Sequence, residues 1–165
     1  MKKTGVNILS IAFLISLLIS CERDDICAEA TPTTPQLVIE FFSADNPGQN
    51  RNVNDLAVID FERQDTLRFP RTSNISIPLK TNEIETKYIF NINSNDESGG
   101  RIDTLTFSYA TEELYVNRAC GFKVNFIDFR ARQQNNDNPL SWIRDLEVNE
   151  NIIRNESETH LSITY

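Results

Sequence analysis

The stretch Tyr115–Phe126, with the sequence YVNRACGFKVNF, alternates apolar and polar side chains over its second half. The apolar positions of the alternation are Cys120, Phe122, Val124 and Phe126, and the polar positions are Lys123 and Asn125. Successive side chains of a β-strand point to opposite faces of the sheet, so a period of two predicts a strand with one buried face. We therefore expect Cys120 to lie on the buried face of a strand, among aromatic side chains.

The same period recurs along the chain on both sides of this stretch. Its apolar positions are Ile75, Ile77 and Leu79; Tyr88, Phe90 and Ile92; Leu105, Phe107 and Tyr109; and Leu161, Ile163 and Tyr165. Clusters of Asn, Asp, Gly and Pro separate these runs, and no segment has the spacing of a long amphipathic helix. The pattern predicts an all-β protein, an antiparallel β-sandwich or flattened barrel of about seven to nine strands.

Residues 1–20 have the features of an export signal. Two lysines precede an apolar run, residues 6–19, that is shorter than a typical membrane-spanning helix. The run ends in the sequence LISC at 18–21, which resembles the lipobox of bacterial lipoproteins. The resemblance implies that Cys21 is lipidated and that the signal is cleaved before it. The alternative is an ordinary signal peptide that leaves Cys21 as a free thiol.

The charged residues directly after Cys21 carry a second resemblance. They are Glu22, Arg23, Asp24 and Asp25. This pattern resembles the surface-export signal of lipoproteins from Bacteroidota, in which a basic residue and two acids follow the lipidated cysteine. The resemblance implies a protein anchored in the outer membrane and facing the cell surface, whereas without the signal it would face the periplasm. The alternative is that these residues form only a solvated tether.

The chain divides into three predicted segments with different compositions. We expect a lipoprotein signal peptide at 1–20, a lipidated, Pro/Thr-rich tether at 21–36 and a single β-sandwich domain at 37–165. The formal charge is −8, and it becomes −10 when residues 1–20 and their two lysines are removed. This acidic balance argues against nucleic acid and anionic lipid headgroups as partners.

The two cysteines that remain after Cys21 is lipidated form a natural pair. In an oxidising compartment, Cys27 and Cys120 predict a disulfide. Closing so long a loop stabilises a fold by about 4–5 kcal/mol in the chain-entropy model. The alternative, metal ligation together with His160, lacks a fourth ligand. We therefore expect a structural disulfide and no metal.

The sequence offers no convincing catalytic or cofactor site. His160 lies opposite the apolar side chains of the last predicted strand, so we expect it to face solvent. Glu112 and Glu113 are adjacent and would point to opposite faces of a strand, which makes them poor partners for glycoside hydrolysis. The oxygen-rich loops at 93–100 and 133–139 lack the glycine and distal glutamate of an EF-hand. We expect a protein without enzymatic activity and without a cofactor.

One short repeat has two interpretations. RQDTLRF at 63–69 recurs as RIDTLTF at 101–107. The simpler interpretation is that two strands have similar structural requirements where they begin and therefore have similar sequences there. The alternative is that Asp-Thr-Leu resembles the O-glycosylation acceptor of Bacteroidota envelope proteins, which implies glycans on Thr66 and Thr104.

Two aromatic residues beside predicted loops are candidates for contact with a glycan. Trp142 and Tyr115 would form a carbohydrate platform if both were exposed. Packing in the core is the alternative, and we favour it for Trp142 because this sequence has few large residues with which to fill a core.

Several stretches resemble a family of small lipoproteins from Bacteroidota that is known only as a domain of unknown function. They are CERDDIC at 21–27, LVIEFF at 37–42, YVNRACGFKVNF at 115–126 and HLSITY at 160–165. The resemblance covers nearly all of the chain after the signal peptide. It implies an envelope location and the extent of the domain, but it brings no activity, cofactor or catalytic residue.

These observations favour a lipoprotein, anchored in the outer membrane through Cys21, that serves as a non-enzymatic binding or structural accessory of the envelope. Its expected partners are the membrane and an envelope protein or glycan. A second class is an envelope-assembly protein or inhibitor that acts by strand addition at an open sheet edge. A third, less favoured class is a hydrolase that uses carboxylates.

The lipobox makes a direct prediction about Cys21. Cys21→Ala removes the only thiol that can take the lipid, so the variant is released or misrouted and is not labelled by a clickable fatty acid. In-gel fluorescence of native and variant protein in the source cells measures this. Label retained on the variant would reject the lipobox assignment.

Overall fold

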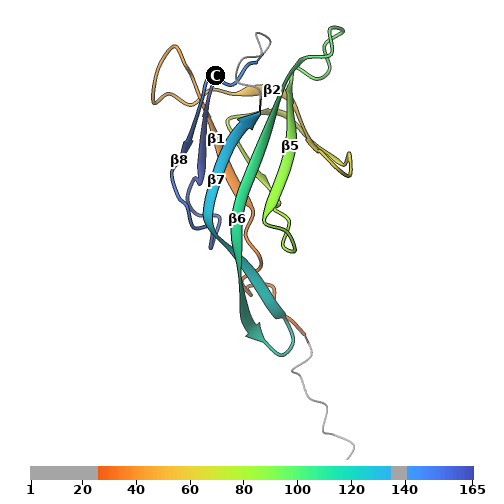
Figure 1. The fold of residues 1–165 in the computed structure, drawn as a ribbon, viewed down its shortest axis with the longest axis vertical. Helices are drawn as coiled ribbons and strands as arrows, with labels where there is room; N and C mark the ends of the chain where they lie inside the picture. Colours follow the sequence, from red (N-terminus) through yellow and green to blue (C-terminus); the bar gives the residue numbers. More distant parts are fainter. Residues whose placement is uncertain (1–25, 135–140) are drawn as a thin grey trace, which may run out of the picture. The chain divides into compact units, whose positions relative to one another are not determined.

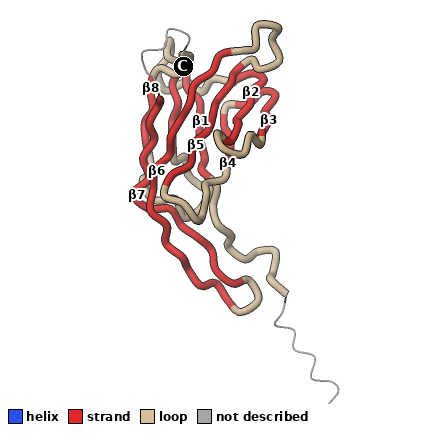
Figure 2. Tube along the Cα trace, turned by 45° about the vertical axis from the view of Figure 1, so that its right-hand side comes forward, coloured by secondary structure: helices blue, strands red, loops and turns tan. Residues whose placement is uncertain are grey.

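The computed structural model describes residues 26–134 and 141–165, which form nine strands (Figures 1 and 2). The strands are β1 (Leu37–Phe42), β2 (Val53–Asp60), β3 (Thr66–Thr72), β4 (Asn74–Ile77), β5 (Glu85–Ile92), β6 (Arg101–Asn117), β7 (Gly121–Gln134), β8 (Asp145–Val148) and β9 (Leu161–Thr164). Within these residues there is no helix, and therefore none long and apolar enough to cross a membrane.

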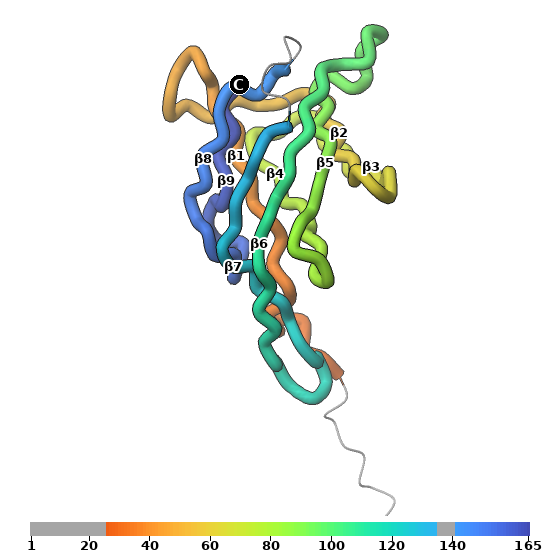
Figure 3. The backbone as a smooth tube through the Cα atoms, in the orientation of Figure 1, coloured from red at the N-terminus to blue at the C-terminus, as the bar shows by residue number. Residues whose placement is uncertain are grey.

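The strands form two sheets, of four strands in the order β4-β1-β9-β8 and of five strands in the order β3-β2-β5-β6-β7. The prediction of an all-β sandwich with seven to nine strands is confirmed, and the sheets do not close into a barrel. One pair differs from the antiparallel rule, because β1 runs parallel to β9. Figure 3 shows these two strands side by side, although they come from opposite ends of the described chain.

The alternating sequence positions fill the space between the sheets. In β1, Leu37, Ile39 and Phe41 are fully buried, while the residues between them are partly exposed. The predicted inward positions of β5 and of residues 105–109 are all buried as well. Each large apolar side chain that leaves water contributes about 1.5–3 kcal/mol, so burial of these strand faces is a main source of the stability of the sandwich.

The described chain divides into two compact units. The sandwich unit comprises residues 33–114 and 123–165 and contains the whole hydrophobic core. The disulfide unit comprises residues 26–32 and 115–122. Strands β6 and β7 contribute residues to both units.

The prediction that His160 faces solvent is wrong, since this side chain is only 2% exposed. The N–H of Val38 donates to His160 Nδ1 at 3.0 Å, and the N–H of His160 donates to the carbonyl oxygen of Val38 at 3.1 Å. These two hydrogen bonds continue the pairing between β1 and β9 to the residue that precedes β9. Sequence periodicity could not predict that His160 is buried, because the backbone N–H that satisfies its ring nitrogen belongs to a strand far away in the sequence.

Burial lowers the pKa of His160 below its ordinary value of 6.5, although an Asn155 backbone hydrogen bond and three nearby glutamates oppose the shift. A proton on Nδ1 would also remove the acceptor that Val38 uses. The folded protein therefore prefers neutral imidazole, whereas the unfolded chain takes up a proton near pH 6.5.

We predict that acidification destabilises the protein through this one residue. Because the folded pKa is lowered, the contribution to stability is complete above pH 6.5 and is lost as pH falls through the folded pKa, with a slope of at most about 1.4 kcal/mol per pH unit. Melting temperatures at pH 7.5 and 5.5 measure the loss. His160→Asn, which keeps an acceptor but does not titrate, is expected to be less sensitive, and an equal pH dependence in both proteins would contradict the assignment.

Candidate anion-binding site

A pocket of about 360 Å³ lies in the sandwich unit, where several strands end. It is lined by Ala44, Asp45, Arg51, Asn52, Val53, Asn54, Ile92, Asn93, Arg101, Trp142, Arg144 and Tyr165. These residues lie between β1 and β2, at the start of β2, at the end of β5 and directly after it, at the start of β6, before β8, and after β9. The register of the two sheets therefore brings distant parts of the sequence to one place.

Three arginines make this pocket cationic in a chain whose formal charge is −8. The one carboxylate side chain in its lining, that of Asp45, lies 4.0 Å from Arg51 Nη1. Within residues 26–134 and 141–165, no carboxylate lies within ion-pair distance of Arg101 or Arg144. A guanidinium presents a planar fork of donors that matches a carboxylate or a phosphate, so this pocket suits an anion.

Tyr165 forms an aromatic wall that is fixed on several sides. Arg51 Cζ lies 4.6 Å from the centre of its ring, and Arg51 Nη1 donates to the backbone oxygen of Tyr165 at 3.1 Å. Its hydroxyl donates to the carbonyl oxygen of Asn52 at 2.7 Å, and its ring meets the Trp142 ring edge-on at 5.3 Å. Burial raises the pKa of Tyr165, with Arg51 opposing the shift, so the phenol stays neutral near pH 7.

The buried carboxylate of Asp103 holds the segment that contributes Trp142 and Arg144 to the pocket lining. Its Oδ2 accepts hydrogen bonds from the backbone N–H groups of Trp142 and Ile143 at 2.8 and 2.9 Å, and its Oδ1 accepts one from Gln133 Nε2 at 2.9 Å. Asp103 is only 3% exposed, and a buried charge is tolerated only when it is hydrogen-bonded in this way. Sequence reasoning saw Asp103 only as part of a repeat.

The other half of that repeat has a different environment. Asp65 is exposed just before β3, and Thr66 is exposed at the start of this edge strand. Thr104 is half-buried in β6, a strand that is hydrogen-bonded on both sides. Thr66 is thus more exposed than Thr104, and glycosylation of either residue stays a prediction.

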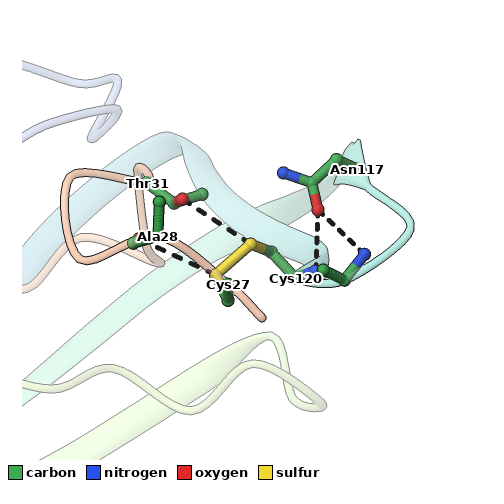
Figure 4. The surroundings of a disulfide bond; sticks show 6 residues. Cys27, Ala28, Thr31, Asn117 and Cys120 are labelled. Carbon is green, nitrogen blue, oxygen red and sulfur yellow. Dashed lines mark hydrogen bonds between the residues drawn. A yellow bond between two sulfur atoms is a disulfide. The ribbon is translucent and has the colours of Figure 1, made fainter. Parts of the chain in front are cut away.

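The structure contains the disulfide between Cys27 and Cys120, 93 positions apart, that the sequence predicts (Figure 4). Its surroundings differ from the prediction, because Cys120 lies in the turn before β7 and not on a buried strand face. Phe122 is 64% exposed and Asn125 is buried, the reverse of what was expected. The physical reason is an alternation interrupted between Phe122 and Phe126, where Asn125 and Phe126 are buried in succession.

The remaining predicted residues fall at separate places. Trp142 is fully buried, which confirms the packing interpretation and excludes it from a surface platform, and Tyr115 is 62% exposed. Cys21 and the charged residues Glu22, Arg23, Asp24 and Asp25 lie outside the described residues. In the described part of the chain, no group of three or more His, Cys, Asp or Glu side chains could hold a metal ion.

A family model described as "Family of unknown function (DUF6452)" matches residues 55–165, so the chain belongs to this family. The match includes Asp103, Arg101 and Arg144, but it begins after the stretches at 21–27 and 37–42. No curated protein and no solved structure matches the chain.

The clamp formed by Asp103 makes a prediction about stability. Asp103→Ala leaves two buried backbone donors and the Gln133 amide without this acceptor, which costs about 3 kcal/mol of unfolding free energy. Asp65→Ala, at the matching position of the repeat, changes an exposed side chain and is expected to stay within about 0.5 kcal/mol of wild type. Urea unfolding compares the two variants, and equal losses would show that Asp103 is not a clamp.

Proposed function

We propose that this member of the DUF6452 family is a lipid-anchored, non-enzymatic binding module of the bacterial cell envelope, and that its arginine-lined pocket holds an anionic ligand. The observation that carries the proposal is the gathering of Arg51, Arg101 and Arg144 around one pocket of an otherwise acidic chain. Cationic side chains gathered in a concave site raise the local concentration of an anion.

The anchor is proposed from the sequence at the start of the chain. The lipobox at 18–21 supports lipidation of Cys21, and the acidic run that follows supports export to the surface of the outer membrane in Bacteroidota. The disulfide between Cys27 and Cys120 agrees with this location, because structural disulfides persist in oxidising compartments outside the cytoplasm.

The ligand that best fits the pocket is a carboxylate-bearing sugar. The arginines supply charge-assisted donors for the carboxylate, while the half-buried ring of Tyr165 supplies an apolar wall for a sugar ring. A volume of about 360 Å³ lies near the lower end of the usual range for small-molecule sites, which favours a short glycan unit over a long enclosed polymer.

A role in catalysis has less support than binding. The arginine-lined pocket has one carboxylate side chain, that of Asp45, and two smaller pockets of the sandwich unit likewise have one each, Asp55 and Asp60. Asp60 already accepts backbone hydrogen bonds from Glu62 and Arg63 at 2.9 and 2.7 Å, so its side chain serves a turn. Hydrolysis by the usual glycosidase mechanisms needs two carboxylates that converge on one bond.

Strand addition also has less support, because the sheet edges are protected. The edge strands β4 and β8 have only four residues each. The edge strand β3 carries Arg68, Pro70 and Arg71, and the edge strand β7 carries Arg130 and Arg132. Short strands, charges and proline are the devices that prevent a further strand from pairing.

The binding proposal predicts the effect of two arginines on recognition of an acidic sugar. Galacturonate should shift the indole N–H signal of Trp142, the only tryptophan in the chain, in an NMR titration, and galactose should not. Replacing both Arg101→Gln and Arg144→Gln should weaken galacturonate binding at least about tenfold, because each lost charged hydrogen bond is worth more than about 1.4 kcal/mol.

A matched control separates the site from the general charge. The double variant Arg130→Gln, Arg132→Gln removes the same charge from exposed positions of β7 that do not line the pocket, and it should bind as wild type does. Equal weakening by both double variants, or no response of wild type to galacturonate, would reject the pocket as the site.

A further inference from the structure

The disulfide unit, residues 26–32 and 115–122, exposes an unusual share of its apolar side chains. Ile26 is 83% exposed, Phe122 is 64% exposed and Tyr115 is 62% exposed. Isolated exposed apolar residues are common on proteins, but three large ones in a unit this small indicate a surface that contacts something.

The two aromatic rings form a fixed pair beside a braced turn. The ring centres of Tyr115 and Phe122 lie 5.3 Å apart, with an angle of 65° between the ring planes. Asn117 Oδ1 accepts hydrogen bonds from the backbone N–H groups of Ala119 and Cys120 at 2.9 and 2.8 Å, which shapes the turn between β6 and β7. Figure 4 shows this turn bonded through Cys120 to Cys27.

The covalent structure limits how far this unit can lie from Cys21. A chain spans at most about 3.5 Å per residue, so the six steps from Cys21 to Cys27 reach no more than about 21 Å. Because Cys27 is bonded to Cys120, the turn that contains Cys120 must also lie close to Cys21. If Cys21 carries lipid, as the proposed function holds, Tyr115 and Phe122 are confined to the neighbourhood of the bilayer surface.

We propose that Ile26, Tyr115 and Phe122 form a second membrane contact, which inserts into the interface of the same bilayer that holds the lipid on Cys21. Tyr115 suits the membrane–water interface because its ring is apolar and its hydroxyl is polar. Phe122 and Ile26 supply further apolar area for insertion. The described residues of the unit carry one acid, Glu29, and one base, so they do not share the acidic balance of the whole chain.

The diacylglycerol of a lipobox cysteine has two acyl chains and already anchors the chain stably, so the effect of a second contact is to restrict the orientation of the protein on the membrane. A glycan is a weaker fit as the partner of this surface. Two rings inclined at 65° do not present one flat face for a sugar to stack on.

The test attaches the chain from residue 21 onward to vesicles through Cys21, its one cysteine outside the disulfide, with a maleimide lipid. The vesicles contain zwitterionic lipids brominated along their acyl chains, which quench tryptophan fluorescence on contact. Phe122→Trp places a reporter in the proposed contact, and Ile84→Trp places one at a 76% exposed position of the sandwich unit. The signal of buried Trp142 is measured in wild type and subtracted.

We expect the added fluorescence of Phe122→Trp to fall by most of its value in brominated vesicles, while that of Ile84→Trp stays unchanged. No quenching of either reporter, or equal quenching of both, would overturn the membrane contact. Because the lipid is attached chemically, these outcomes are independent of whether cells lipidate Cys21, which fatty-acid labelling tests separately.

Discussion

The carboxylate of Asp103 is the constraint on which the ligand pocket depends. It is buried in β6 and accepts two backbone hydrogen bonds from Trp142 and Ile143, which fixes a segment that has no strand partner of its own there. Trp142 then packs edge-on against Tyr165, and Arg144 follows directly, with its backbone N–H donating to Thr164 at 2.8 Å. Burying the Asp103 carboxylate costs solvation free energy, but its hydrogen bonds fix the positions of Trp142 and Arg144 beside Tyr165.

The alternating runs predicted the sandwich because burial of one strand face is a local property of the sequence. Ile75, Phe90 and Phe107 all face the core as expected. The parallel pairing of β1 with β9 was not predictable in this way, since alternation identifies a face but not a neighbouring strand. The burial of His160 was missed for the same reason, because its hydrogen-bond partner lies on β1.

The pocket could not be predicted from the sequence, although each of its residues is visible there. Arg51, Arg101 and Arg144 lie far apart along the chain, and the repeat that contains Arg101 matches it to Arg63 and not to the other two, so only the strand order brings them together. Cys27 and Cys120 were predictable as a pair because the expected lipidation of Cys21 left no other cysteine for either of them to bond with. The prediction was correct for the bond but wrong for its surroundings, because Phe122 was expected to be buried beside Cys120 and is exposed.

Both proposals assign this chain to a boundary between membrane and exterior, with lipid contact in the disulfide unit and ligand contact in the sandwich unit. The most direct test of the binding claim is a crystal structure of the protein grown with galacturonate. The account predicts density for the sugar in the pocket beside Tyr165, with its carboxylate within hydrogen-bond distance of Arg101 or Arg144. A pocket that stays free of sugar at saturating galacturonate, or a sugar bound only elsewhere, would contradict it.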